Sequence, residues 1–593
     1  MPIRHFYRDV PSITPILATL ALIALVPTGL VGKDDPAVAK PAAASRIVGR
    51  KISDFVLPDP QGKMIGLGDY NDKRGVVVVF LGTACPIGNA YLPILAELRT
   101  AYAAKQIEVL GIYANPGDTQ ESISKHRTEY NIEFPVLLDA KQETLGLFGA
   151  TRMAETFLLD SRYVVRYHGR IDDRIGYDYK REDAQHHDLR NAIDALLSNE
   201  PIAKPETDTA GCLITHREQR KKRGTVNYAE HIAPLLAKHC VDCHHPGTAA
   251  PFSLTSYDDA ANWAEMMREV VVQRRMPPWH ADPRFGTFAN DRRLSVEEID
   301  TLAAWVDSGS PLGDPAKVPA APTFEQGWRI GKPDIVFTMP RTYKVPAKGT
   351  VSYQYFVTPT DFKEDMWVQA AEPRPGSRAA VHHIIVYYRD PKNPETKKTP
   401  VWITATAPGA DPTIFPPGMA RKIPAGAELV WQMHYTPTGK EEFDQSEVGF
   451  VFAKEPPQHE VKNHGVTNVR FAIPPGDSHF RVAASEPVRH DTVVLALFPH
   501  MHLRGRDFTY FAVDPKGNRT KLLSVPQYDF NWQLSYRLAE PLELKKGSRI
   551  ECEAHFDNSP RNPANPDPKA TVKFGEQTWE EMMFGYVEFY TKQ

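Results

Sequence analysis

The residues with the most specific chemistry in this chain are Cys240, Cys243 and His244, in the run Cys-Val-Asp-Cys-His. Two thiols at this spacing, followed at once by an imidazole, form the attachment motif of a c-type haem. The thiols bond to the vinyl groups, and the histidine ligates the iron. A zinc or disulfide site is the alternative, but the sequence offers no second cysteine pair to complete a four-ligand zinc site. The motif predicts one covalent haem and therefore the transfer of single electrons.

The second axial ligand of this haem should be a methionine or histidine further along the chain. We select Met276, because it lies in the proline-stiffened run Arg-Met-Pro-Pro-Trp, where Trp279 could cover the haem edge. The rival residues are Met266, Met267, His245 and His280.

Four short groups of histidine and methionine form a second set of candidate ligands. They are His382-His383, Gln432-Met433-His434-Tyr435, His500-Met501-His502 and Glu580-Glu581-Met582-Met583. His500 and His502 are two apart on a strand-like run, so both imidazoles should face one side. Adjacent His382 and His383 could share one ion only at a strand end or a bulge. Imidazole suits copper in both oxidation states, and a thioether favours Cu(I).

A third reactive group is the thiol of Cys85, between an apolar run (76–81) and a helix-like segment (89–105). A thiolate at the N-terminus of a helix has a lowered pKa and is reactive. Gly88 stands where a CxxC motif has its second cysteine, so Cys212 is the candidate resolving thiol. The alternative is a redox-silent docking domain in which Cys85 is a small buried apolar residue.

Residues 46–205 alternate strand and helix patterns around this cysteine. The predicted strands are 76–81, 108–113, 134–138 and a hairpin over 156–170, and the predicted helices are 89–105, 119–131 and 182–197. This order, with Cys85 after the first strand, resembles the α/β thioredoxin-like fold of the peroxiredoxin and redoxin families. The chain departs from that pattern at Gly88 and near Ala154-Glu155-Thr156, where the families have a proline.

Residues 222–316 should form a small helical domain around the haem motif. We predict a helix over 228–239 and a second over 299–306, with a capping box from Ser295 to Glu298 and a C-cap at Gly309. This arrangement resembles the small, all-α class of cytochrome c domains.

From about residue 325 the pattern changes to short alternating strands, which predicts two all-β, jelly-roll-like sandwiches over 325–458 and 459–593. The four ligand groups in this order resemble the copper type II monooxygenases, the family of peptidylglycine and dopamine hydroxylases. The resemblance implies two coppers. One would be held by His382, His383 and His434, and the other by His500, His502 and Met582. In that family the first copper supplies an electron, and O2 and the substrate react at the second.

Three positions limit what this resemblance implies about the substrate. Phe498 stands where the peptide-hydroxylating members have an arginine, and Phe584 stands where they have an asparagine, although Tyr586 is retained. A peptide ending in a glycine carboxylate is therefore a poor candidate, and an apolar or aromatic substrate fits better. Cys552 alone cannot form the disulfides common in animal members.

The N-terminus indicates export. Residues 1–32 carry Arg4 and Arg8 before an apolar run, which is the pattern of a signal peptide or a membrane anchor, and residues 33–45 form a linker. Either interpretation predicts a periplasmic or cell-envelope protein, and an anchor would attach it to the membrane. A formal net charge of −3 argues against nucleic acid as a partner.

Together these patterns predict an exported oxidoreductase in which the haem relays electrons to a dicopper monooxygenase. It would use O2, a small-molecule substrate and an external donor such as ascorbate. Two alternatives are open: a non-catalytic electron-transfer or copper-handling protein, and a carbohydrate- or surface-binding module with incidental histidines.

Overall fold

The computed structural model describes residues 47–592, apart from residues 178, 217–224, 249, 321–323, 325 and 326. The predicted signal or anchor and the linker lie outside the described residues. Among the helices of the described part, none is long and apolar enough to cross a membrane.

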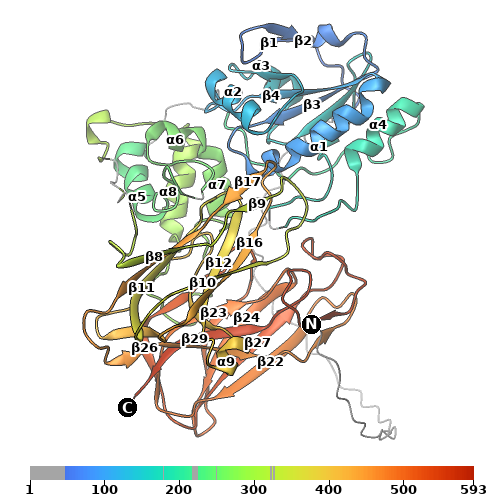
Figure 1. Cartoon of the computed structure of the whole chain (residues 1–593). Helices are drawn as coiled ribbons and strands as arrows, with labels where there is room; N and C mark the ends of the chain where they lie inside the picture. Colours follow the sequence, from blue (N-terminus) through green and yellow to red (C-terminus); the bar gives the residue numbers. More distant parts are fainter. Residues whose placement is uncertain are drawn as a thin grey trace, which may run out of the picture. The chain divides into compact units, whose positions relative to one another are not determined.

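The first domain is built on a five-stranded sheet in the order β5-β4-β3-β6-β7, shown in blue to teal in Figure 1. Its strands are β3 (Gly75–Leu81), β4 (Ile107–Tyr113), β5 (Val136–Leu138), β6 (Thr156–Asp160) and β7 (Val165–Gly169). Its helices are α1 (Pro86–Tyr102), α2 (Gln120–Glu129), α3 (Glu143–Phe148) and α4 (Asp188–Ser198), and the small strands β1 (Val56–Pro58) and β2 (Met64–Gly66) pair beside it. All seven residues of β3 are buried, because side chains on its two faces enter two separate cores. The predicted α/β thioredoxin-like fold is confirmed, although α3, β1 and β2 were not predicted.

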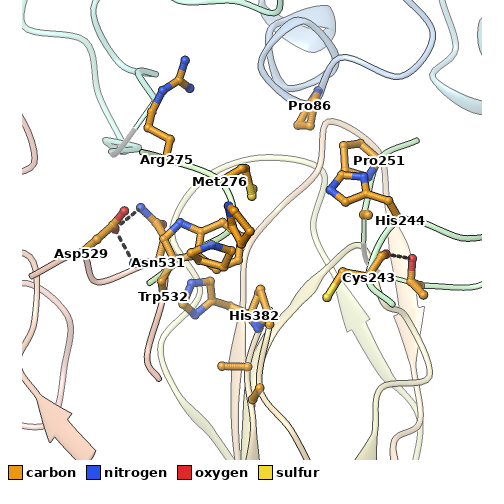
Figure 2. A pocket seen from close by; sticks show the side chains of 18 of the residues that line it. Pro86, Cys243, His244, Pro251, Arg275, Met276, His382, Asp529, Asn531 and Trp532 are labelled. Atoms are coloured by element: carbon orange, nitrogen blue, oxygen red, sulfur yellow. Dashed lines mark hydrogen bonds between the residues drawn. The ribbon is translucent and has the colours of Figure 1, made fainter. Parts of the chain in front are cut away.

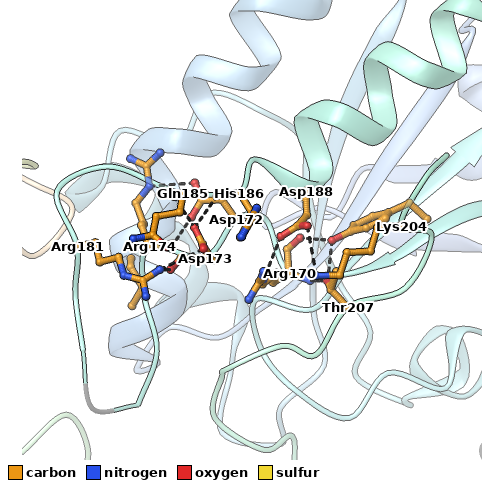
Figure 3. A network of polar contacts seen from close by, with 12 residues as sticks. Arg170, Asp172, Asp173, Arg174, Arg181, Gln185, His186, Asp188, Lys204 and Thr207 are labelled. Carbon is orange, nitrogen blue, oxygen red and sulfur yellow. Dashed lines mark hydrogen bonds and ion pairs between the residues drawn. The ribbon is translucent and has the colours of Figure 1, made fainter. Parts of the chain in front are cut away.

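Helix α4 begins at Asp188, six residues later than predicted. The carboxylate of Asp173 explains the difference, because its Oδ1 accepts the backbone N–H groups of Gln185 (2.7 Å) and His186 (2.9 Å). Backbone groups held in this way are not available for a helical turn. Figure 3 shows Asp173 within a network that also contains the Arg170–Asp188 and Arg181–Asp173 ion pairs.

The next segment is helical, but it contains more helices than predicted. A π-helical turn (Tyr228–Ile232) leads into α5 (Ala233–His239), followed by α6 (Tyr257–Asn262), α7 (Ala264–Val272) and α8 (Val296–Asp307). The predicted capping box is present, since Ser295 Oγ accepts from Glu298 N at 3.1 Å and the Glu298 carboxylate accepts from Ser295 N. Trp305 is fully buried among these helices.

The large C-terminal region is all-β, as predicted. Its first half contains β8 (Ile335–Thr338), β9 (Tyr343–Val345), β10 (Gln354–Pro359), β11 (Met366–Arg374), β12 (Val381–Arg389), α9 (Pro394–Lys398), β13 (Val401–Thr406), β14 (Thr413–Ile414), β15 (Met419–Ile423), β16 (Glu428–Tyr435), β17 (Glu442–Asp444), β18 (Glu447–Phe452) and β19 (His459–Glu460). Two main sheets have the orders β10-β16-β12-β13 and β19-β15-β11-β18-β8. Because β19 pairs with β15, the first sandwich reaches past the predicted boundary at 458.

The second half repeats this layout in the strands coloured orange to red (Figure 1). It contains β20 (Lys462–Thr467), β21 (Ala472–Ile473), β22 (Phe480–Pro487), β23 (Thr492–His500), β24 (Gly505–Val513), β25 (Arg519–Val525), β26 (Tyr536–Leu544), β27 (Arg549–Phe556), β28 (Val572–Lys573) and β29 (Phe584–Thr591). Its sheets have the orders β20-β29-β23-β26 and β22-β27-β24-β25.

The prediction for Trp279 is wrong. Its side chain is buried against Phe288 and Tyr536 in the core of the second sandwich, and it does not cover the haem motif. The loop after α7 pairs with this sandwich through Phe288 and Leu538, which removes the indole from the helical segment.

Candidate functional site

The imidazoles of His382, His383 and His434 form one compact cluster. The two adjacent histidines are the second and third residues of β12, where the register with β16 shifts between Val381 and His383. This bulge lets neighbouring side chains turn to the same side, as a shared ion would require. One ligand nitrogen from each ring lies within 4.8 Å of the other two.

The electrostatics of this cluster suit a cation. Burial lowers the pKa of His382 to about 4 and lowers those of His383 and His434 well below the usual range, so the rings are neutral at pH 7. His382 Nε2 and His434 Nδ1 are buried without a hydrogen-bond partner. A buried nitrogen without a partner is costly unless a metal uses its lone pair, so the site fits copper.

His500 and His502 form a second pair, with ring centroids 5.2 Å apart. Their approach does not come from strand alternation as predicted, because β23 ends at His500 and His502 lies in the following turn. His500 Nδ1 bonds to Gln533 Oε1 at 2.8 Å, and His502 Nδ1 bonds to the Glu580 carbonyl at 3.3 Å. Each Nδ1 is therefore engaged, and the buried Nε2 of His502 has no partner. This second site also fits a metal bound through Nε2.

Glu581 connects this pair to Met582, a role that sequence reasoning missed. Its fully buried carboxylate accepts the backbone N–H groups of His502 (2.9 Å), Arg504 (2.6 Å) and Met582 (3.2 Å). One side chain thus fixes the two chain segments that carry the predicted ligands. The signal in the sequence was the second acidic residue directly before Met582.

The Cys240-Cys243-His244 motif follows α5 and opens into a cavity of about 1680 Å³. His244 Nδ1 bonds to the Phe252 carbonyl at 3.0 Å, which leaves Nε2 as the ligand atom, and burial lowers the pKa of the ring. Typical small-molecule pockets measure ~300–1,000 Å³, so the space and the oriented imidazole fit a large planar group such as haem.

The same cavity reaches both histidine groups. Figure 2 shows Cys243, His244, Met276, His382 and Trp532 around one space, and His502 also lines it. The rival axial ligands Met266, Met267, His245 and His280 line the cavity with Met276, so the structure does not choose among them.

Cys85 caps the N-terminus of α1, and its Sγ accepts from Gly88 N at 3.3 Å. Cys212 belongs to the same buried core, and its thiol is close enough to perturb the acidity of Cys85. Both side chains are buried, and all five cysteines of the chain are free thiols in this structure.

The residues at the predicted substrate position form an aromatic group. Tyr586 stacks on Phe584 and on Phe498, with centroids 5.2 Å and 5.8 Å apart. Together with Trp402, Phe498 and Tyr586 line a second cavity of about 140 Å³, which also touches His383 and Gln533.

Comparison with known families identifies two of these regions. Residues 48–173, which contain Cys85, match the AhpC/TSA family, and residues 463–593 match the C-terminal domain of copper type II ascorbate-dependent monooxygenases. The second match contains His500, His502 and Met582. The chain is therefore an oxidoreductase with a thioredoxin-like domain and a copper monooxygenase-type C-terminal domain.

Individual relatives match the thioredoxin-like part. The thiol-disulfide oxidoreductase ResA of Geobacillus thermodenitrificans is 29% identical over 140 residues, which cover 24% of this chain and 75% of the relative. Hypothetical protein SMc02350 from Sinorhizobium meliloti is 31% identical, with a TM-score of 0.27 and coverage of 29% of this chain and 95% of its own. A putative thiol:disulfide interchange protein DsbE from Chlorobium tepidum is 23% identical and has a TM-score of 0.21. The match covers 25% of this chain and 97% of that protein.

Proposed function

We propose that this protein is a copper monooxygenase that hydroxylates a C–H bond with O2, using single electrons relayed through a covalent haem. The reaction is R–H + O2 + 2e⁻ + 2H⁺ → R–OH + H2O. Cys240, Cys243 and His244 would hold the haem within a cytochrome c-type domain, and Met276 is the residue we select as its second protein ligand. His382, His383 and His434 hold one copper, and His500, His502 and Met582 hold the other.

The observation that carries this proposal is the shared cavity. Cys243 and His244 line the same space as His382 and His502, which come from the two histidine groups. Electron transfer needs short distances, so a relay requires that the haem motif and the ligand groups lie together. A chain of independent binding modules has no need of such an arrangement.

The protein residues around the copper sites orient ligands and exclude water. When bound, copper supplies one-electron chemistry and activation of O2, while neutral, buried imidazoles supply the ligand nitrogens. Gln533 and the Glu580 carbonyl hold the two imidazoles of the second site in one tautomer. Phe530 fills space beside both groups, with its ring centroid 5.5 Å from that of His382 and 5.9 Å from that of His502.

The aromatic cavity supports an uncharged, apolar or aromatic substrate. Phe498, Trp402 and Tyr586 offer ring faces and edges there, and its volume of about 140 Å³ suits a single small ring. Arg292 and Arg537 also line this cavity, and Arg292 is paired with Asp411 at 2.6 Å.

The remaining parts of the proposal concern location and the electron source. The match to an ascorbate-dependent family supports ascorbate as an external reductant. A covalent haem and the N-terminal pattern of residues 1–32 support export to the periplasm or cell envelope.

The first test is the copper content of the haem-loaded full chain after reconstitution and desalting. We expect about two coppers per chain, falling to about one when His500, His502 and Met582 are all replaced by Ala. His479, Asp507 and His555 form another cluster whose ligand atoms lie within 4.8 Å. The control variant His479→Ala/His555→Ala should therefore keep about two coppers. If the copper is lost only in this control, the dicopper assignment is wrong.

Oxygen uptake separates the enzyme from the carrier. In copper-loaded protein with ascorbate, His502→Ala and Met582→Ala should each abolish substrate-dependent O2 consumption. Undiminished consumption in both variants would instead favour an electron-transfer or copper-handling protein. A haem-free Cys243→Ala variant should keep its copper but turn over more slowly, whereas an unchanged rate would eliminate the relay.

A further inference from the structure

We propose that Cys85 and Cys212 form a reversible intrachain disulfide that exchanges with small thiols from the cavity and is closed to protein partners. This inference needs no metal chemistry, but the small thiol uses the same cavity that the haem motif lines. It concerns a cysteine that lies outside the segment matched to the AhpC/TSA family, which ends at residue 173.

The segment around Cys212 is docked on the loop next to Cys85. Met153 N donates to the Cys212 carbonyl at 2.9 Å, and Ile214 N donates to the Thr151 carbonyl at 2.9 Å. Arg152 and Leu213 form an antiparallel bridge between these two hydrogen bonds. Residues 211–214 therefore lie as a short strand along the loop that leads into β6.

The approach of the two chains is too close for any side chain at Gly211. A Cβ atom there would overlap the carbonyl oxygen of Met153, and one at Gly82 would overlap the Met153 side chain. The close packing brings the backbone of Cys212 against the loop, and Cys212 shares a buried core with Cys85.

The chain before Cys212 is also fixed. His168 N donates to the Pro205 carbonyl at 2.9 Å, and Thr207 N donates to the His168 carbonyl at 3.0 Å, so this segment runs beside β7. Thr207 Oγ1 accepts from Arg170 N at 2.9 Å (Figure 3). Cys212 is thus held in place by backbone contacts on both sides.

The two thiols differ in acidity. A hydrogen bond from Cys212 lowers the pKa of Cys85 despite burial, helped by the N–H groups of Ile87 and Gly88 at the start of α1. The same hydrogen bond and burial raise the pKa of Cys212. Cys85 is therefore the thiolate when the pair is reduced, and it is the better leaving group when the pair is oxidised.

The two cysteines also differ in their access to solvent. This difference decides which sulfur of the disulfide a small thiolate attacks. Cys212 is 7% exposed and lines the large cavity, whereas Cys85 is 0% exposed and does not. A small thiolate RS⁻ attacks Cys212 Sγ, forming an RS–S–Cys212 bond and releasing the Cys85 thiolate. A second RSH then releases Cys212 as the thiol. The sum is Cys85–S–S–Cys212 + 2 RSH ⇌ Cys85–SH + Cys212–SH + RS–SR, with both electrons from the small thiol.

Protein partners are excluded because the backbone edge at residues 151–153, which they would pair with, is already occupied. An extended peptide binds beside a reactive cysteine by pairing with free backbone groups. Here the groups of Thr151 and Met153 are already paired with residues 212 and 214 of the same chain. A small molecule needs no such edge.

Peptide mapping of the full chain tests the pair directly. After incubation with oxidised glutathione, we expect a Cys85–Cys212 cross-linked peptide as the main product, which dithiothreitol removes. Cys552→Ser, at a buried cysteine elsewhere, should give the same product. Stable glutathione on Cys85 with a free Cys212 would overturn the proposal, as would unreacted thiols at both positions.

The docked strand is tested with Gly211→Val, which should undock residues 211–214. In the unaltered protein, dithiothreitol should reduce the oxidised pair while thioredoxin, used as a protein probe, should not. We expect Gly211→Val to speed reduction by thioredoxin about tenfold or more. Gly146→Ala, where a Cβ meets nothing within 4 Å, is the matched control. Rapid reduction of the unaltered protein by thioredoxin would contradict closure to protein partners.

Discussion

The phenyl ring of Phe530 is stacked on the imidazole of His382, with centroids 5.5 Å apart and planes inclined by 13°. The same ring lies 6.0 Å from that of His434 and meets His502 nearly at a right angle, at 5.9 Å. One side chain therefore contacts imidazoles of both candidate copper sites. Its apolar surface occupies space that water would otherwise fill.

We expect Phe530→Ala to keep both coppers but to uncouple O2 reduction from substrate hydroxylation. Removing the ring admits water beside the sites, and water favours release of reduced oxygen before the C–H bond reacts. The measurement is peroxide formed per O2 consumed, which should rise severalfold. The exposed Phe443→Ala is the control. An unchanged peroxide yield in Phe530→Ala would show that the ring does not protect the reaction.

Gln533→Leu should weaken copper binding at the second site. Its Oε1 accepts a hydrogen bond from His500 Nδ1, and loss of such a partner lowers metal affinity by ~10–100-fold. Competition with a chelator should remove one of the two coppers at a lower chelator concentration than in the unaltered protein. Gln533→Glu keeps an acceptor and should restore most of the affinity. Equal affinities in all three proteins would contradict this role.

Gly88→Cys should redirect the thiol chemistry. A Cβ at this position lies 3.5 Å from Cys85 Sγ, so a new thiol could compete with Cys212. After oxidation, peptide mapping should find Cys85 linked to position 88 and Cys212 free for alkylation. If the Cys85–Cys212 link remains the main product, the docked strand favours pairing with Cys212 more than closeness in sequence favours pairing with position 88.

Asp118→Asn should remove a pH-dependent loss of stability. Burial raises the pKa of Asp118 to about 6, although Thr83 donates two hydrogen bonds to its Oδ1. The folded state therefore holds this proton more tightly than the unfolded state, where the pKa is near 3.8. Stability falls as the pH rises from about 4 to about 6, by about 3 kcal/mol at most, and the loss persists above that range.

Urea denaturation between pH 4 and pH 7 measures this effect. Asn keeps an oxygen for Thr83 but does not ionise, so the variant should gain stability relative to the unaltered protein as the pH rises. Asp72→Asn, at an exposed carboxylate, should leave the profile unchanged. Parallel profiles for Asp118→Asn and the unaltered protein would show that this carboxyl does not contribute to the pH dependence of the free energy of unfolding.

The local sequence was sufficient to predict the strands and helices that have a clear apolar periodicity of their own. The apolar run of β3 and the period of α1 predicted a buried strand and the helix after it. The order of four His/Met groups, which resembles a known family, drew attention to both histidine groups. For one shared ion, the adjacent pair His382-His383 required a strand end or a bulge, because two neighbours on a regular strand face opposite ways.

The remaining features depend on contacts between distant residues. Glu581 accepts from His502 across 79 positions, which no spacing rule reveals. Trp279 follows two prolines in the sequence, yet its side chain packs in the apolar core of the second sandwich. Helices α6 and α7 are short, with six and nine residues, so their periodic signal was weak.

The carboxylate of Glu581 also has a consequence for biosynthesis. During translation, His500 and His502 are made long before the segment that holds Met582, since Glu581 follows His502 by 79 positions. Until that segment folds back, the backbone N–H groups of His502 and Arg504 lack their acceptor. The His382–His383–His434 cluster, made from β12 and β16, can form earlier. The residues of the proposed first site can therefore come together in the nascent chain well before those of the proposed second site.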